Sequence, residues 1–271
     1  MDINQIIGYL LALFAGVSIG MMGSGGSILT VPILVYIMHI EPVLATAYSL
    51  FIVGTSAAAG SIKNIRQKQV NFQIVLSFGA ASIVSVFFTR SYLLPLIPDS
   101  IQLANETEIS KSSLIMVIFA LVMLAASSKM ISPRKKENLP NQEAVTSFVP
   151  LAIQGALIGL IAGMVGAGGG FLIVPTLIFF AHLPMRMAIG TSVTIIAIQS
   201  LIGFTGDLIV QDIDWIVVLI FTAVSILGVF VGMRWANKFS EKLLRKIFGW
   251  FVLTMAVFIL LNEVNLTDLS V

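Results

Sequence analysis

The sequence GMMGSGGSILTVP at residues 20–32 returns at residues 163–175 as GMVGAGGGFLIVP. In both copies a cluster of glycines lies between apolar residues and is followed by Val-Pro. Glycine loses more backbone freedom on ordering than any other residue, so an ordered glycine cluster is costly. Two such clusters in the same apolar context indicate a shared task.

The repeated stretch belongs to a longer internal duplication. A shift of 143 positions (163 − 20) aligns the halves without a gap well beyond the glycines. Apolar composition alone could match Leu with Leu, but it would not readily place several Gly, a Pro and a His in register. The matched pairs are Gly20/Gly163, Met21/Met164, Gly23/Gly166, Gly25/Gly168, Gly26/Gly169, Leu29/Leu172, Val31/Val174, Pro32/Pro175, His39/His182, Ala45/Ala188, Ser49/Ser192 and Gly60/Gly203.

The composition predicts a polytopic membrane protein. Of the 271 residues, 58% are hydrophobic and 10% are charged, whereas a soluble domain has about 25% charged residues. Uncharged runs at residues 72–88, 114–128 and 215–233 approach the roughly 20 residues that span a bilayer. The absence of cysteine excludes disulfides, thiolate metal sites and cysteine nucleophiles. The first segment lacks a basic leader, so we expect it to be retained.

Ten apolar segments define an all-α fold of two repeats with about five segments each. They are residues 6–22, 28–38, 43–61, 72–94, 113–129, 148–165, 171–180, 187–204, 215–236 and 243–261. The second and seventh are too short to span and directly follow a glycine cluster, which predicts short or broken helices there. The first transmembrane repeat is assigned to residues 1–131, a cytoplasmic linker to 132–146 and the second repeat to 147–271.

The loop charges predict that the repeats have inverted topology. Lys63, Arg66 and Lys68 follow the third segment, whereas the equivalent loop after the eighth segment carries aspartates. Because Lys and Arg accumulate on the cytoplasmic side, equivalent loops should lie on opposite sides of the membrane. Both termini are then expected outside the cytoplasm. We expect Arg90 to snorkel towards the headgroups and Asp207 to be solvated at the end of its segment.

Inverted repeats with interrupted helices favour a transport site near the bilayer midplane. Broken backbone in a membrane is tolerated only where protein or a water-filled cavity satisfies it, so we expect the two breaks to converge at the centre. Free N–H groups of the following helices would favour an anion there. The candidate substrate-binding residues are Gly23, Ser24, Gly25, Gly26, Ser27, Ser49, Gly166, Gly168, Gly169, Gly170, Thr191, Ser192 and Gln199.

The alternative for glycines and hydroxyls is ordinary helix packing. For Gly16/Gly20, Gly159/Gly163 and Gly228/Gly232 we expect close helix–helix contacts of the small-residue type. Ser49 and Ser192 are as well explained by hydrogen bonds to backbone as by a ligand. We expect His39 and His182 to anchor the chain at the interface, and we predict no metal site and no cofactor.

The doubled Gly-x-Gly-Gly-x-x-x-Val-Pro pattern and the stretches ATAYSL (45–50) and AIGTSV (188–193) resemble the sulfite exporter TauE/SafE family. The resemblance covers nearly the whole chain. It implies a multi-pass permease of a bacterial inner membrane that moves sulfite, organosulfonates or related small sulfur-containing anions. Its partners would be that anion and the lipid bilayer, without nucleic acid; a homo-oligomer is left open.

We therefore predict a secondary transporter, and an exporter, rather than an enzyme. The expected segment interiors contain no carboxylate, so we hypothesise export driven by the membrane potential without an obligatory proton relay. An intramembrane serine hydrolase using Ser24 and an anion channel are the alternatives. The second copy carries Ala167 where the first carries Ser24, which weighs against the hydrolase.

Overall fold

The computed structural model describes residues 3–23, 25–98, 100–102, 108–131, 148–166, 169–208, 211–236, 238 and 240–268. The first half contains α1 (Ile3–Met22), α2 (Gly25–Pro32), the π-helical turn η1 (Ile33–Ile37), α3 (Pro42–Arg66), α4 (Phe72–Ile74), η2 (Val75–Gly79), α5 (Ala80–Phe88), η3 (Thr89–Leu93), α6 (Leu94–Leu96), β1 (Ser100–Gln102), β2 (Glu108–Ser110) and α7 (Lys111–Ile131). The second half contains α8 (Phe148–Val165), α9 (Gly170–Phe179), α10 (Met185–Asp207), α11 (Trp215–Ala236) and α12 (Glu241–Asp268).

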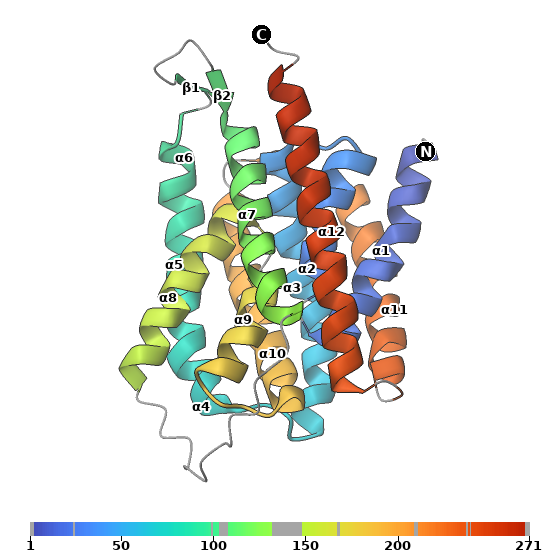
Figure 1. The fold of residues 1–271 in the computed structure, drawn as a ribbon, viewed down its shortest axis with the longest axis vertical. Coiled ribbons are helices and arrows are strands. Elements are labelled where there is room, and N and C mark those ends of the chain that lie inside the picture. Colours follow the sequence, from blue (N-terminus) through green and yellow to red (C-terminus); the bar gives the residue numbers. More distant parts are fainter. Residues whose placement is uncertain are drawn as a thin grey trace.

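The fold is an all-α polytopic membrane bundle, as the sequence predicts. Among the described residues, six helical stretches are long and apolar enough to cross a membrane, including the continuous stretch Phe72–Leu96. Three further apolar helical stretches are shorter. The antiparallel pair β1 and β2 lies in the connection between α6 and α7, beyond the helices of the bundle (Figure 1). This hairpin is a local feature that the prediction of an all-α chain did not include.

The bundle has two ends that are distinguished by the chain segments they carry. Helix α1 begins and α12 ends at one end, here called the terminal end, and α8 and α12 begin at the opposite end, here called the linker end (Figure 1). Helix α1 starts at the terminal end and α8 starts at the linker end. The first helices of the halves thus run in opposite directions, as inverted repeats require, while the two-fold relation itself stays a prediction.

Helices of the two halves pair with each other across the bundle. Helix α1 packs along α11, and α8 packs along α5. Helix α3 packs on α10, and α7 packs on α12. Under the 143-residue shift, the first pair is equivalent to the second, and the pair of α3 and α10 is equivalent to itself. In Figure 1, α5 and α8 form one flank, α1 and α11 form the other, and α7 and α12 cover one face.

The predicted small-residue contacts are confirmed. A Cβ on Gly16 or Gly20 would overlap the backbone of α11 at Ser225 or Val229, respectively. A Cβ on Gly159 would overlap the Ser82 carbonyl oxygen in the same way, and Gly163 faces Thr89. Gly228 and Gly232 complete the interface between α1 and α11 from the other side. These glycines bring helix backbones together, which is how small residues stabilise helix pairs in lipid.

A Gly16→Val substitution should therefore destabilise the bundle by about 3 kcal/mol, because overpacked contacts cost about 1–3 kcal/mol and backbone cannot move aside as a side chain can. The measurement is the melting temperature of the purified protein in detergent. Leu10→Val on the same helix is the matched control, since Leu10 is 64% exposed on the surface that lipid covers. Equal melting temperatures for the two variants would contradict this assignment of Gly16.

Polar side chains fix where the helices begin after each connection. Glu41 precedes Pro42 and accepts the Leu44 N–H at 3.0 Å, which caps the start of α3. Asn71 caps α4 through the Ile74 N–H at 3.2 Å. Asp214 caps α11 through the Ile216 N–H at 3.0 Å. Asn71 and Asp214 are equivalent under the shift (214 − 71 = 143), so both halves start their fourth segment in the same manner.

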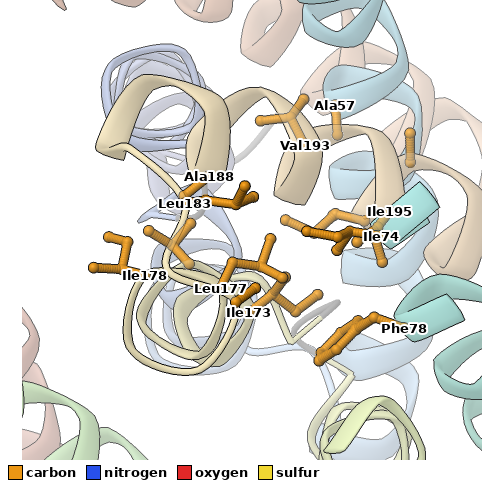
Figure 2. Close-up of a cluster of buried hydrophobic side chains, with 14 of the residues drawn as sticks. Ala57, Ile74, Phe78, Ile173, Leu177, Ile178, Leu183, Ala188, Val193 and Ile195 are labelled. Atoms are coloured by element: carbon orange, nitrogen blue, oxygen red, sulfur yellow. The ribbon is translucent and has the colours of Figure 1, made fainter. Parts of the chain in front are cut away.

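Helix α9 is held by a buried apolar cluster. Ile173, Leu177 and Ile178 of α9 pack against α10 and against the start of the stretch that begins with α4 (Figure 2). Ile74 and Phe78 close the cluster from that stretch. The short helix that follows the second glycine cluster is thus inside the bundle.

Candidate functional site

Both glycine clusters are breaks between helices, as predicted. Helix α1 ends at Met22, and α2 begins at Gly25. Helix α8 ends at Val165, and α9 begins at Gly170. Gly23 and Gly166 are equivalent (166 − 23 = 143), and both have positive φ angles, 74° and 68°. Each N–H closes the preceding helix, on the Ile19 or Ala162 carbonyl. Residues other than glycine are strained in this left-handed conformation.

The two breaks form the tips of helical hairpins that enter the bundle from opposite ends. Gly23 lies against Ile189 and Val193 in the first three turns of α10. Gly166 lies against Thr46 in the first two turns of α3. These helices start at opposite ends of the bundle (Figure 1), whereas the sequence predicts that the breaks converge at the midplane. The breaks do not meet at the midplane because α1 and α8 have 20 and 18 residues. At a rise of about 1.5 Å per residue, each helix is long enough to carry its glycine break past the middle of the bundle.

The second break brings two predicted site residues together. Gly169 has a φ of 64° and caps α9, and its carbonyl accepts the N–H groups of Leu172 and Ile173. The Nε2 atom of Gln199 is 3.4 Å from where a Cβ on Gly169 would lie. Gln199 is fully buried, and its Oε1 accepts the Ser82 hydroxyl at 2.5 Å. A buried amide therefore borders the start of α9, where the first N–H groups have no partner within the helix.

The predicted hydroxyl residues have varied surroundings. Thr191 accepts the Asn71 N–H at 3.0 Å, and the Ser192 hydroxyl donates to the Ile189 carbonyl at 2.9 Å. Ser49 is fully buried, and its hydroxyl has no hydrogen-bond partner. Tyr48, equivalent to Thr191, accepts the Asp214 N–H at 2.7 Å. Thr191 and Tyr48 thus each hold the start of a neighbouring helix, which is a structural use of both hydroxyls.

The remaining predicted residues are placed as follows. Gly25 and Gly170 are the first residues of α2 and α9, and Ser27 lies in the first turn of α2. Gly26 packs inside its own hairpin against Ile19. Ser24 and Gly168 lie outside the described residues.

The expectation for Arg90 and Asp207 is wrong. Neither side chain reaches solvent: Arg90 is 1% exposed and Asp207 is 4% exposed. Nη1 of Arg90 lies 3.2 Å from Oδ1 of Asp207, so the two form a buried ion pair between η3 and α10. Asp207 is the last residue of α10 and lies outside the expected segment 187–204, so the prediction that the segment interiors contain no carboxylate is not affected. Snorkelling fails because Arg90 sits on the face of its helix that meets α8 and α10, away from lipid.

The ion pair belongs to a regular contact between parallel helices. Gln199 meets Ser82, Gly203 meets Val86 and Asp207 meets Arg90, each pair being 117 positions apart. Arg90 also lies at the second glycine break, because its Nη2 would overlap a Cβ on Gly166. Hydropathy averages conceal a single charge in an apolar run. The signal available in the sequence is that a charged residue inside a membrane segment is costly and commonly functional.

Comparison with known proteins identifies the family. The profile described as sulfite exporter TauE/SafE matches residues 8–259. The chain belongs to the TauE/SafE family. The protein is accordingly a multi-pass membrane transporter. The doubled glycine clusters of this TauE/SafE chain, first noted in its sequence, are the hairpin tips described above.

Curated relatives of the TauE/SafE chain cover nearly its full length. A probable membrane transporter protein of Xylella fastidiosa (strain 9a5c) is 28% identical over 248 residues, 90% of either chain. The probable membrane transporter protein YjnA of Bacillus subtilis (strain 168) is 24% identical over 250 residues, 90% of this chain and 95% of that protein. A probable membrane transporter protein of Haemophilus influenzae is 28% identical over 269 residues, 92% and 95% of the two chains. No solved structure matches the chain.

Proposed function

We propose that this TauE/SafE protein is a secondary transporter that exports small sulfur-containing anions, such as sulfite or organosulfonates, across a bacterial inner membrane. The family description supports the class of substrate. The observation that carries the proposal is the break at Gly166–Gly169, where α9 starts inside the bundle beside the buried amide of Gln199. Unpaired N–H groups at a helix start attract an anion, and glycine lets it approach the backbone.

The first break contributes in the same way from the other side. Helix α2 starts at Gly25, and its tip at Gly23 packs against α10. Helices α2 and α9 contact each other inside the bundle. A substrate that moves between the two helix starts would travel along the line between the two ends of the bundle. This arrangement favours alternating exposure of one path over two unrelated sites.

The orientation follows from the charges at the two ends. Lys63, Arg66, Arg186, Arg234 and Lys238 lie at the linker end, where α3 and α11 finish and α10 starts. Glu41, Asp212 and Asp214 lie at the terminal end. Since cytoplasmic ends are rich in Lys and Arg, the linker end faces the cytoplasm and both termini face outward.

Introduced cysteines test this orientation cleanly, because the chain has no cysteine of its own. In intact cells a membrane-impermeant maleimide should label Asp212→Cys and should leave Asn141→Cys unlabelled. Permeabilising the cells should expose Asn141→Cys to the same reagent. Labelling of Asn141→Cys alone in intact cells would reverse the orientation.

The membrane potential supports export of a monovalent anion from a cell that is negative inside. It contributes about 2.3 kcal/mol per charge per 100 mV, which corresponds to a gradient of about 50-fold. Because Asp207 is a buried carboxylate at the end of α10, the driving force is measured with the membrane potential and the pH gradient set separately.

Proteoliposomes test the proposed function. We expect saturable counterflow of sulfite and methanesulfonate, and weak or no movement of acetate and chloride. Vesicles without protein are the control for leakage. Saturation together with counterflow distinguishes a carrier from an anion channel, which would conduct without countertransport. Protein that inserts correctly but moves neither sulfur-containing anion would overturn the proposal.

A further inference from the structure

The buried guanidinium of Arg90 uses only part of its hydrogen-bonding capacity. Nη1 donates to Asp207, whereas Nε and Nη2 are buried and have no hydrogen-bond partner. A guanidinium presents five N–H donors in a planar fork. Unpartnered donors on a buried cation are costly, and an oxyanion is the acceptor that fits this fork best. Arg90 therefore has unused donors for a second acceptor, and one of them, Nη2, faces Gly166.

Two further polar atoms near the pair are also unpartnered. Oδ2 of Asp207 is buried without a partner, and so is the hydroxyl of Ser91. The Ser91 hydroxyl lies 2.8 Å from where a Cβ on Gly206 would lie, next to Asp207 in the chain. Arg90 and Ser91 thus offer several hydrogen-bond donors in this cluster, but only Nη1 of Arg90 is paired, with Oδ1 of Asp207. A purely structural ion pair would leave these buried donors unsatisfied. An added group that accepts hydrogen bonds would satisfy them.

The equivalent place in the other half carries no ion pair. Under the 143-residue shift, Arg90 corresponds to Met233 (233 − 90) and Asp207 corresponds to Asn64 (207 − 64). Met233 and Asn64 are both buried, at 8% and 7% exposure. Near these positions Ser82 corresponds to Ser225 and Val86 to Val229, so the shift still holds there. The charges are thus specific to the break at Gly166, while the fold accepts an uncharged pair at the matching position.

We propose that Arg90 binds the transported oxyanion at the Gly166 break, and that Asp207 is the resident counter-ion which the oxyanion displaces. Without substrate, Asp207 keeps the buried guanidinium neutralised. With substrate, two oxygens of the sulfite or sulfonate group occupy the fork, and the contact between Nη1 and Oδ1 opens. This inference rests on the proposed function for the chemistry of the substrate. It adds a cation to a site otherwise made of backbone and amide groups.

The competition predicts opposite effects for the two residues. Asp207→Asn removes the resident anion, so the half-saturation concentration for sulfite and methanesulfonate should fall roughly tenfold to hundredfold. Arg90→Lys keeps the charge but loses the fork, so the half-saturation concentration should rise by a similar factor. Both are measured by counterflow in proteoliposomes, and binding is measured independently as the anion-dependent rise in melting temperature in detergent.

The double variant Arg90→Met/Asp207→Asn separates binding from a structural role. It copies the uncharged pair Met233 and Asn64, which the same fold already accommodates. We expect it to insert and remain monodisperse, and to lose anion-dependent stabilisation and counterflow. If the ion pair only joins η3 to α10, the double variant will transport with the half-saturation of the unmodified protein, and the inference is overturned. An unchanged half-saturation in Asp207→Asn would overturn it as well.

The outcome also separates this inference from the proposed function. If the unmodified protein moves neither sulfur-containing anion but is stabilised by phosphate, and Asp207→Asn strengthens that stabilisation, the Arg90 site stands and the substrate assignment fails. If the sulfur-containing anions are transported and the variants leave their half-saturation unchanged, the substrate assignment stands and the Arg90 site fails.

Discussion

An Arg90→Met substitution is expected to destabilise the folded protein by about 3–5 kcal/mol, because it leaves the buried carboxylate of Asp207 without its cation. Removing one partner of a buried ion pair costs far more than the pair itself contributes, since the remaining charge is desolvated and unpaired. The melting temperature in detergent should fall by roughly 10 °C for a chain of this length.

The matched control adds Asp207→Asn to the same protein. Replacing both partners by uncharged residues of similar size is commonly neutral or stabilising, so the double variant should recover most of the lost melting temperature. A double variant as unstable as Arg90→Met would mean that the destabilisation comes from lost packing of the arginine side chain. That result would contradict the explanation by an uncompensated charge.

A Gly166→Val substitution is expected to reduce transport about 100-fold or more. Gly166 has a φ of 68°, a conformation that is strongly unfavourable for a β-branched residue. A Cβ there would also overlap Thr46 and the guanidinium of Arg90. The tip of the hairpin must then move, which displaces the start of α9. Losing two or three hydrogen bonds to a charged substrate accounts for a loss of this size.

The measurement for Gly166→Val is initial counterflow per inserted molecule, with insertion checked by size-exclusion chromatography. Gly79→Ala is the control, because a Cβ on Gly79 would make only an ordinary van der Waals contact with Ile195 Cγ1 at 3.4 Å, and Gly79 has a helical φ of −65°. If valine at position 166 prevents insertion, Gly166→Ala is a milder variant. Its flux should lie between the flux of Gly166→Val and that of Gly79→Ala. Normal flux in both Gly166 variants would show that the break takes no part in transport.

Much of the fold can be predicted from the sequence because the duplication constrains it twice. The 143-residue shift locates both helix breaks, and the positive φ angles at Gly23 and Gly166 explain why glycine is needed there. The small-residue pairs identify the close contacts between α1 and α11 and between α5 and α8. These predictions succeed because each depends on residues that are close in sequence or on a pattern that occurs twice.

The parts that escape prediction depend on contacts between distant residues. Arg90 and Asp207 are 117 positions apart, and only the parallel packing of α5 and η3 on α10 brings them together. The π-helical turn η3, which carries Arg90, has no marker in the sequence. The level of each glycine break also depends on how far α1 and α8 extend into the bundle. Local patterns determine that a break occurs, whereas tertiary packing determines what it faces.

The cross-wise pairing of helices has a mechanical consequence. The hairpin of α1 and α2 is attached by backbone contacts to α11 of the other half, and the hairpin of α8 and α9 is attached likewise to α5. A rocking motion that kept residues 1–131 rigid against residues 147–271 would have to pull these backbones apart. We expect the rigid bodies of the transport cycle to be mixed instead, one built around α1 and α11 and the other around α5 and α8. The boundary between the two sequence repeats would then not indicate where the hinge of the transport cycle lies.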